Sequence, residues 1–457
     1  YWQILPIGPT SYGDSPYQSF STYAGNPYFI SLEELIEQGL LTEKECDKVD
    51  FGDKIDKVDY EKLYNGRFKL LKKAYKRSNI REREEFKKFK DENQYWLNDY
   101  AMFMAIKERF KGQSFDNWAE DIKLRWGYSM EYYQNELKEE IEFYEFVQYE
   151  FYRQWYKLKK YANDNGVKII GDIPIYVAYD SADVWSHPEL FQIDDKGKTI
   201  AVAGCPPDGF SATGQLWGNP LYKWDYHKQT NYDWWIKRIE RSVQLYDVVR
   251  IDHFRGFDEY YSIPARDEDA TNGHWEKGPG IDLFNAIKYC LGNVNIIAED
   301  LGYITDSVRQ LVNDSGFPNM KVLEFAFDSR DSSGPREYLP YNYNKNCVVY
   351  TGTHDNETLV SWLDNITPQE RRQVRKYLNN FKDSGKELCD DLICLVMQSV
   401  ANLCIVPMQD YLGLDNSARM NQPSTLGKNW KWRLKEGQFT AELQKEMLEL
   451  ATRYGRR

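Results

Sequence analysis

The sequence predicts an α/β fold, a (β/α)8 barrel of the TIM type that carries long helical and loop insertions. Three short apolar runs end in acidic residues, at residues 246–254, 295–301 and 347–355. Runs rich in Val and Ile are typical of buried parallel strands. Acids that follow such strands lie together at the carboxyl-terminal rim of a barrel. The pattern therefore predicts a barrel whose rim holds several carboxyl groups.

Four further runs have strand character, so that seven strands are expected in all. In chain order they are residues 2–7, 166–175, 246–254, 295–301, 320–327, 347–355 and 403–410. Helical segments are expected between several of them, at residues 232–246, 282–291, 305–315 and 368–402. Alternation of strands and helices at this spacing favours a parallel α/β topology.

Two insertions interrupt the alternation. Residues 25–163 are highly charged and helical in pattern, and Ser31, before two glutamates, is typical of a helix start. The stretch is too long for an ordinary barrel loop, so we expect a helical subdomain there. Residues 185–225 are rich in Gly and Pro, which predicts a long shaped loop over the barrel mouth. The expected division is a strand with its active-site loop at 1–24, the helical insertion at 25–163, and the remaining barrel at 164–457.

Charge and composition argue against several classes of partner. The chain of 457 residues has a net charge of −12, which argues against nucleic acid and against a membrane as partner. Its seven cysteines are an odd number without paired spacing, which indicates reduced thiols in a cytoplasmic protein. No Cys/His cluster of the zinc type occurs, no other metal site is visible from the spacing of possible ligands, and no cofactor is expected. No apolar run reaches the roughly 18 residues of a membrane span, and the first residues show no signal-peptide pattern.

The stretch Arg250-Ile251-Asp252 contains the strongest candidate for a reactive acid. Side chains alternate along a strand, so Arg250 and Asp252 point to the same face. A nearby positive charge keeps a carboxylate ionised, and an ionised carboxylate at a strand end can act as a nucleophile. From these residues alone, a structural ion pair at a strand end is an equal alternative.

Four motifs carry a resemblance to a known family. They are the loop from Gly8 to Phe20, the stretch around Asp252, Ala298-Glu299-Asp300-Leu301-Gly302, and Thr351-Gly352-Thr353-His354-Asp355-Asn356. In this order they resemble the 4-α-glucanotransferases (amylomaltases, or disproportionating enzymes) of the α-amylase clan, over the whole chain. The resemblance implies that residues 2–7 form the second barrel strand. The first strand and its helix, on the order of 30 residues, are then expected to be absent from the chain as given.

The resemblance also implies the catalytic roles. Asp252 is similar to the family's nucleophile, which forms a covalent glucosyl intermediate. Glu299 is similar to the general acid/base, and Asp355 to the residue that stabilises the transition state. Retaining chemistry of this kind needs two carboxyl groups about 5–5.5 Å apart. For the neighbouring Asp300, a helix N-cap or a structural hydrogen bond is expected rather than catalysis.

Further residues are expected to bind the sugar. By resemblance, Tyr17 stacks on the glucose at the cleaved bond, and Trp217 of the covering loop contacts the glucan. The whole expected set is Tyr17, Asp14, Asp172, Gln215, Trp217, Arg250, His253, His354 and Asn421, with Phe210 beside Trp217. Several of these have alternatives: Trp217 as an anchor of its loop, His253 as a residue that strand alternation turns away from the Asp252 face, and Asp172 and His354 as purely structural residues. Near Asn421, Ser424 stands where the family has Gly.

The expected function is transfer of an α-1,4-glucan segment to another glucan or to glucose. The expected partners are therefore α-1,4-glucans and malto-oligosaccharides. An α-amylase-type hydrolase is the alternative within enzymes, because it shares the first step and uses water as the acceptor. A non-catalytic glycan-binding relative is the alternative outside enzymes, and the presence of all three acids argues against it. Transfer is favoured because aromatic covering loops hold the acceptor and exclude water.

Overall fold

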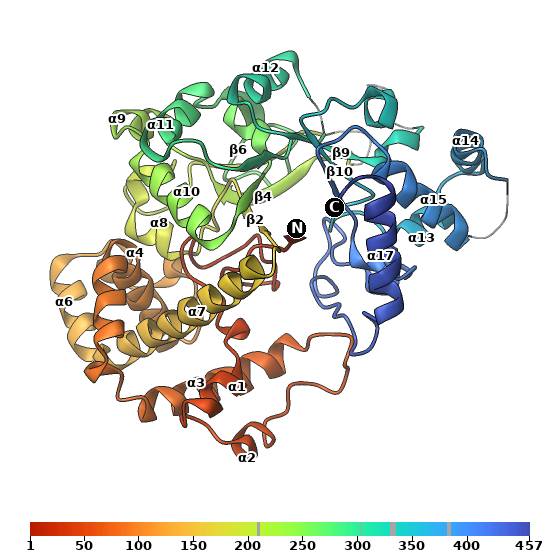
Figure 1. Cartoon of the computed structure of the whole chain (residues 1–457). Coiled ribbons are helices and arrows are strands. Elements are labelled where there is room, and N and C mark those ends of the chain that lie inside the picture. Colours follow the sequence, from red (N-terminus) through yellow and green to blue (C-terminus); the bar gives the residue numbers. More distant parts are fainter. Residues whose placement is uncertain (208–210, 303, 330–334, 382–384) are drawn as a thin grey trace. The chain divides into compact units, whose positions relative to one another are not determined.

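The chain divides into two compact units. The computed structural model describes residues 1–457 except 208–210, 303, 330–334 and 382–384. The first unit comprises residues 1–52 and 60–296, and the second comprises residues 53–59 and 297–457. Parallel strands with helices between them form the framework (Figure 1).

Seven short strands follow the order β1-β2-β5-β8-β9-β10-β11. In the first unit β1 pairs with β2 and β2 with β5, and in the second β8 pairs with β9, β9 with β10, and β10 with β11, all in parallel. Their bounds are β1 (Trp2–Gln3), β2 (Ile169–Pro174), β5 (Val248–Asp252), β8 (Ile296–Ala298), β9 (Asn319–Val322), β10 (Cys347–Tyr350) and β11 (Leu403–Ile405). Each predicted strand segment overlaps one of these strands, and β9 begins one residue before its segment. The prediction of a parallel α/β barrel is thereby confirmed.

Helices separate the strands as the alternation predicts. Their bounds are α8 (Ala182–Ser186), α9 (Trp224–Gln229), α10 (Asp233–Leu245), α11 (Ile281–Leu291), α12 (Asp306–Ser315), α13 (Leu359–Asn365), α14 (Pro368–Leu378), α15 (Gly385–Met397), α16 (Met408–Tyr411) and α17 (Ala441–Arg453). The predicted helices at 232–246, 282–291 and 305–315 are confirmed as α10, α11 and α12.

Three predicted segments differ from the structure. The strand expected to Phe327 ends at Val322, and the short 3-10 helix η6 (Leu323–Phe327) follows it. The strand expected to Asp410 ends at Ile405, and α16 follows directly after Pro407. The helical segment expected at 368–402 is divided between α14 and α15, because α14 ends where Asn379 adopts a left-handed φ of 52°. Asn tolerates that conformation better than most residues and commonly ends helices in it.

The covering segment at 185–225 is more regular than the loop that was expected. It contributes β3 (Ala201–Cys205) and β4 (Gln215–Pro220) to an antiparallel sheet of order β4-β3-β6-β7, completed by β6 (Glu259–Pro264) and β7 (His274–Lys277). A Cβ atom at Gly204 would lie only 2.1 Å from the backbone oxygen of Gln215. The glycine is therefore required for the close approach of β3 to β4.

The range predicted as a helical subdomain contains seven α-helices among the described residues, while its status as a separate subdomain stays a prediction. They are α1 (Leu32–Glu37), α2 (Glu43–Cys46), α3 (Tyr60–Arg77), α4 (Glu84–Arg109), α5 (Glu120–Lys123), α6 (Gly127–Glu136) and α7 (Lys138–Asp164). The Ser31 hydroxyl accepts the backbone N–H of Glu34 and so caps α1 as predicted. The long helices α4 and α7 lie side by side (Figure 1) and join through rings such as Trp96 and Tyr152, whose centroids are 5.9 Å apart.

Gln148 on α7 ties the insertion to the segment after the first strand. Its amide accepts the backbone N–H of Gly25 at 2.7 Å and donates to the Gly25 carbonyl at 2.9 Å. Gln148 is fully buried, and a Cβ at Gly25 would overlap the ring of Phe151 at 2.0 Å. Both polar groups of Gly25 thus depend on one side chain.

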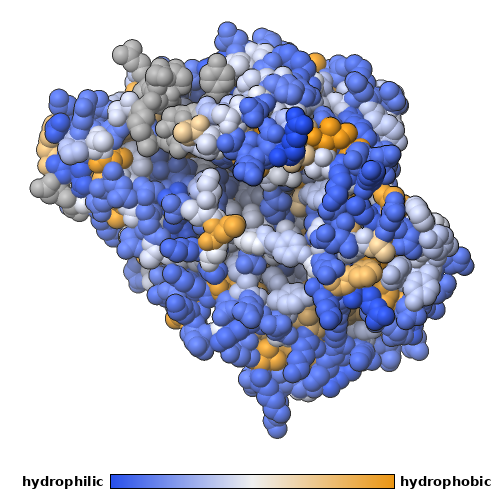
Figure 2. Space-filling model, turned by 180° about the vertical axis from the view of Figure 1, so that it is seen from behind, coloured by the Kyte–Doolittle hydropathy of each residue, from blue (hydrophilic) through white to orange (hydrophobic). Residues whose placement is uncertain are grey.

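The surface is largely hydrophilic, with apolar residues in small separate groups on the face that Figure 2 shows. Among the described residues, no helix is both long enough and apolar enough to cross a membrane. All seven cysteines are free thiols, in agreement with the predicted reduced state.

We expect Gln148→Ala to lower the free energy of unfolding by about 2–4 kcal/mol, because it leaves a buried N–H and a buried carbonyl of Gly25 without partners. Thermal melting followed by circular dichroism measures the loss. Gln134→Ala, an exposed change on α6, is the control and should leave the melting temperature unchanged. Equal melting temperatures for wild type and Gln148→Ala would contradict the prediction.

Candidate active site

Asp252 ends β5, and Arg250 fixes its carboxylate. The Arg250 guanidinium donates from Nη2 to Asp252 Oδ1 at 2.9 Å and from Nη1 to Asp172 Oδ2 at 2.6 Å. The parallel register places Arg250 opposite Asp172 on β2, so that one cation bridges two carboxylates. The side chains of Arg250 and Asp172 are 4% and 1% exposed, whereas that of Asp252 is 31% exposed. Of the two acids, Asp252 is therefore the one that a substrate can reach.

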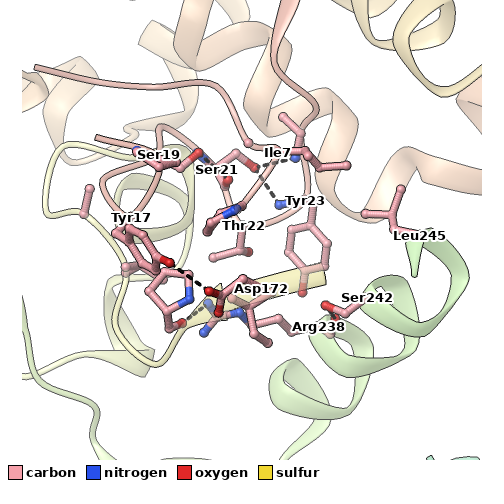
Figure 3. Close-up of a pocket in the computed structure, with 18 of the residues that line it drawn as sticks. Ile7, Tyr17, Ser19, Ser21, Thr22, Tyr23, Asp172, Arg238, Ser242 and Leu245 are labelled. Atoms are coloured by element: carbon pink, nitrogen blue, oxygen red, sulfur yellow. Dashed lines mark hydrogen bonds between the residues drawn. The ribbon is translucent and has the colours of Figure 1, made fainter. Parts of the chain in front are cut away.

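Tyr17 joins the same group from the first loop. Its hydroxyl donates to Asp172 Oδ2 at 2.7 Å, as Figure 3 shows. The cavity beside it, lined by Tyr17, Asp172 and the segment Ser21–Tyr23, has a volume of about 50 Å³. That volume accommodates a few water molecules and is too small for a sugar chain. The cavity is therefore not the place where a glucan binds, and it lies beside the residues that position the carboxylates.

Asp14 lies in the same loop with a left-handed φ of 58°. Its charge contributes to the raised pKa values of Tyr28 and Tyr60, for both of which burial is the larger cause. Asp14 therefore lies near these two tyrosines.

Trp217 on β4 packs against the residue that follows Asp252. Its ring meets the His253 ring edge to face at a centroid distance of 4.8 Å, and its indole N–H donates to Gln215 Oε1 at 3.0 Å. These contacts fit the alternative in which Trp217 anchors its segment, and they leave sugar binding as a proposal. Phe210, expected to share the glucan contact, lies outside the described residues.

His253 does not continue the alternation of β5, because its φ of 56° ends the strand. Its ring also faces Tyr176, at 6.2 Å between centroids. Burial, with a smaller contribution from Arg255, lowers the pKa of His253 to about 3. The imidazole is therefore neutral at neutral pH, and it is in ring contact with Trp217.

In the second unit, Glu299 directly follows β8. It is 8% exposed, and its Oε1 accepts the backbone N–H of Leu301 at 2.9 Å. The next residue, Asp300, accepts the backbone N–H of Met320 at 2.9 Å through Oδ1. Of the two expectations for Asp300, the structural hydrogen bond is confirmed.

Asp355 lies in the loop after β10, where residues near the C-terminus hold it. Asn421 Nδ2 donates to Asp355 Oδ1 at 2.6 Å, and Arg419 Nη2 donates to the Asp355 carbonyl at 2.6 Å. His354 Nε2 lies 3.3 Å from the same carboxylate oxygen. The Asp355 side chain remains 48% exposed. Asn421 was expected to bind sugar, and in the structure its side chain donates a hydrogen bond to the Asp355 carboxylate.

The turn that follows Asn421 contains the one departure from the family motif. Ser424 adopts a left-handed φ of 63°, which is a conformation that glycine adopts without strain. The indole of Trp430, 8% exposed, packs at 5.7 Å from the ring of His354.

Comparison with known proteins decides the family. A family model described as 4-alpha-glucanotransferase matches residues 1–440. The chain belongs to the 4-alpha-glucanotransferase family. A 4-alpha-glucanotransferase of Clostridium butyricum is 50% identical over 458 residues, which cover 100% of this chain and 93% of that protein. A 4-alpha-glucanotransferase of Thermus thermophilus is 44% identical over 451 residues, which cover 97% of this chain and 89% of that protein.

Solved structures agree with this 4-alpha-glucanotransferase assignment. The amylomaltase from Streptococcus agalactiae in complex with acarbose matches with a TM-score of 0.95 and 41% identity, over 100% of this chain and 92% of that one. The amylomaltase from Corynebacterium glutamicum, at 19% identity and a TM-score of 0.76, has the same fold. The predicted family and the predicted class of enzyme, a transferase rather than an α-amylase-type hydrolase, are confirmed.

The structure adds residues to the site that the sequence reasoning missed. Tyr176 continues the face of β2 that carries Asp172, so a period of two residues could have indicated it. Glu324 and Asp410 pack beneath the loop of Asp355, and no motif marks them. Among the described residues, no group of three or more His, Cys, Asp or Glu side chains could hold a metal ion.

We expect Arg250→Met to lower the rate of glucan transfer on the order of 10–100-fold, the equivalent of a lost hydrogen bond to a charged group. It should also destabilise the chain by about 3–5 kcal/mol, because Asp172 is left as a buried charge without its cation. Transfer from maltotriose and thermal melting measure the two effects. Arg266→Met removes an arginine whose side chain is 90% exposed and should change neither. Full activity of Arg250→Met would contradict the role of the bridge.

Proposed function

We propose that this 4-alpha-glucanotransferase cleaves α-1,4-glucosidic bonds with Asp252 as the nucleophile. The observation that carries the proposal is the geometry of the Asp172–Arg250–Asp252 group, which holds one accessible carboxylate at a strand end. In the first step, Asp252 forms a bond to the anomeric carbon while Glu299 gives its proton to the leaving oxygen. The product is a glucosyl ester on Asp252 and a released glucan or glucose.

The second step returns both acids to their starting states. Glu299 accepts the proton of an incoming sugar hydroxyl, whose oxygen bonds to the anomeric carbon and displaces Asp252. Retention of configuration in this mechanism requires that the two carboxyl groups face the same bond, about 5–5.5 Å apart. Burial of Glu299, with one oxygen accepting the Leu301 N–H, supports its role because the orientation of its carboxyl group is fixed.

We assign Asp355 to the transition state. Its carboxylate is held by Asn421 and is half exposed. A carboxylate must be accessible in this way if it is to accept hydrogen bonds from sugar hydroxyls. A fixed negative charge also stabilises the positive charge that develops on the sugar ring. His354, beside it, is proposed to donate to the same sugar.

The substrate class is proposed to be α-1,4-glucans, from maltose upward. The Streptococcus agalactiae amylomaltase is solved in complex with acarbose, which supports a glucan-binding site in this family member. Tyr17, Asp14, Trp217 and Gln215 are proposed to hold the glucan and to keep water from the glucosyl ester, which favours a sugar acceptor.

We also propose a cytoplasmic location, because all seven cysteines are free thiols.

Incubation with maltotriose tests the proposal. The wild type should produce glucose together with oligomers longer than maltotriose, whereas maltose and glucose alone would indicate hydrolysis. Asp252→Asn should reduce transfer by about 1000-fold or more, because the nucleophile is lost.

The matched control is Asp282→Asn, which removes a surface aspartate paired with Lys228 in the same unit and should leave transfer unchanged. Full transferase activity of Asp252→Asn would overturn the mechanism.

A further inference from the structure

A buried carboxyl group lies directly beneath the loop that carries His354 and Asp355. Glu324, in η6 after β9, is 4% exposed. Its Oε1 is buried and accepts no hydrogen bond from any described residue. A buried polar atom without a partner is costly, so its position calls for an explanation.

The carboxyl is in close contact with the backbone of that loop. A Cβ built on Gly352 would lie 2.8 Å from Glu324 Oε1 and 3.1 Å from the Cβ of Asn356. The backbone N–H of Glu324 donates to the Thr351 carbonyl at 3.2 Å. Glu324 therefore forms the floor on which the start of the loop rests, and Gly352 is the residue that allows the contact.

Hydrogen bonds connect this floor to Asp355. Asn356 Oδ1 accepts the backbone N–H of Thr353 at 2.9 Å and its hydroxyl at 2.8 Å. The same hydroxyl oxygen accepts the backbone N–H of Asp355 at 3.3 Å. A shift of Glu324 would move Asn356, and through Thr353 it would move the catalytic carboxylate.

The surroundings favour the neutral form of Glu324. Burial first, and then the charges of Asp410 and Glu357, raise the pKa of Glu324 well above its usual value, while the Asn356 side chain and the charge of Arg419 act in the opposite direction. Asp410 already accepts from the Thr351 hydroxyl at 2.6 Å and from the Leu359 N–H at 2.9 Å. On α15, the facing group is the thiol of Cys389, whose own pKa is raised.

We propose that Glu324 is a positioning residue for the transfer reaction, a neutral carboxylic acid whose shape sets the loop that presents His354 and Asp355. The inference rests on the proposed role of Asp355 and assigns to Glu324 no contact with the substrate. Its contribution is to the placement of a catalytic group, where an error of about 1 Å costs on the order of 100-fold in rate.

Protonation of Glu324 has a consequence for stability. As pH rises above about 4.5, the carboxyl loses its proton in the unfolded chain before it does so in the folded chain. Stability therefore falls with rising pH up to the folded pKa. A glutamine has the same shape and does not titrate, so Glu324→Gln should remove this dependence.

Two substitutions separate shape from charge. Glu324→Gln should keep kcat on maltotriose within about 2-fold, whereas Glu324→Ala should lower kcat about 10–100-fold and change KM by less than about 3-fold. Glu145 is the matched control: it is equally buried, on α7, and its pKa is raised by burial. Glu145→Gln and Glu145→Ala should leave kcat unchanged, whatever they do to the melting temperature.

Each other outcome overturns the proposal. A wild-type kcat in Glu324→Ala would show that the floor is not needed, and a loss in Glu324→Gln as large as in Glu324→Ala would show that the charge is needed. If Glu324→Ala does not fold, the melting temperatures of wild type and Glu324→Gln test the proposal instead. The melting temperature of Glu324→Gln should exceed that of the wild type by an amount that grows between pH 5 and pH 8. A difference that stays constant over this range overturns the proposal.

The test is distinguishable from that of the catalytic assignment. Full activity of Asp355→Asn would overturn the role of Asp355 itself. An inactive Asp355→Asn together with a fully active Glu324→Ala would overturn the role of Glu324 alone.

Discussion

The bridge of Arg250 between Asp172 and Asp252 is the interaction on which the acids of the first unit depend. A buried guanidinium is stable only when it is paired, and the parallel register of β2 with β5 supplies Asp172 directly opposite. The Nη2 group of Arg250 reaches Asp252 at the strand end, where its carboxylate is still accessible. Tyr17 completes the group from the first loop. The same pairing thus stabilises the strands and orients an accessible carboxylate.

The second unit presents its acids in a different way. Glu299 is fixed by the backbone of its own turn through Leu301. Asp355 is instead held from the side by Arg419 and Asn421. One acid therefore has a locally defined orientation, and the other depends on residues more than sixty positions away in the sequence. The loop of Asp355 also has a buried side chain, that of Glu324, in contact with its first residues.

Features that depend on local sequence were predictable, and features that depend on distant partners were not. Strand–acid motifs predicted the barrel and the neighbourhood of Arg250 and Asp252, because alternation along a strand is a local property. The covering segment was expected as a loop, since its Gly and Pro content does not reveal that Gly204 permits β3 to pair with β4. His253 was placed by alternation, but a left-handed φ ends the strand before it. The contact of Asn421 with Asp355, and the position of Glu324, arise only when distant segments meet.

The central claim is that Asp252 is bonded to sugar partway through each cycle. A Glu299→Gln variant, incubated with α-maltosyl fluoride, isolates this step, because fluoride leaves without a proton and the amide cannot activate the acceptor. Mass spectrometry of the intact chain and of its peptides should then find one maltosyl group on the peptide that contains Asp252. A maltosyl group on any other residue, or turnover without an adduct in this variant, would contradict the account.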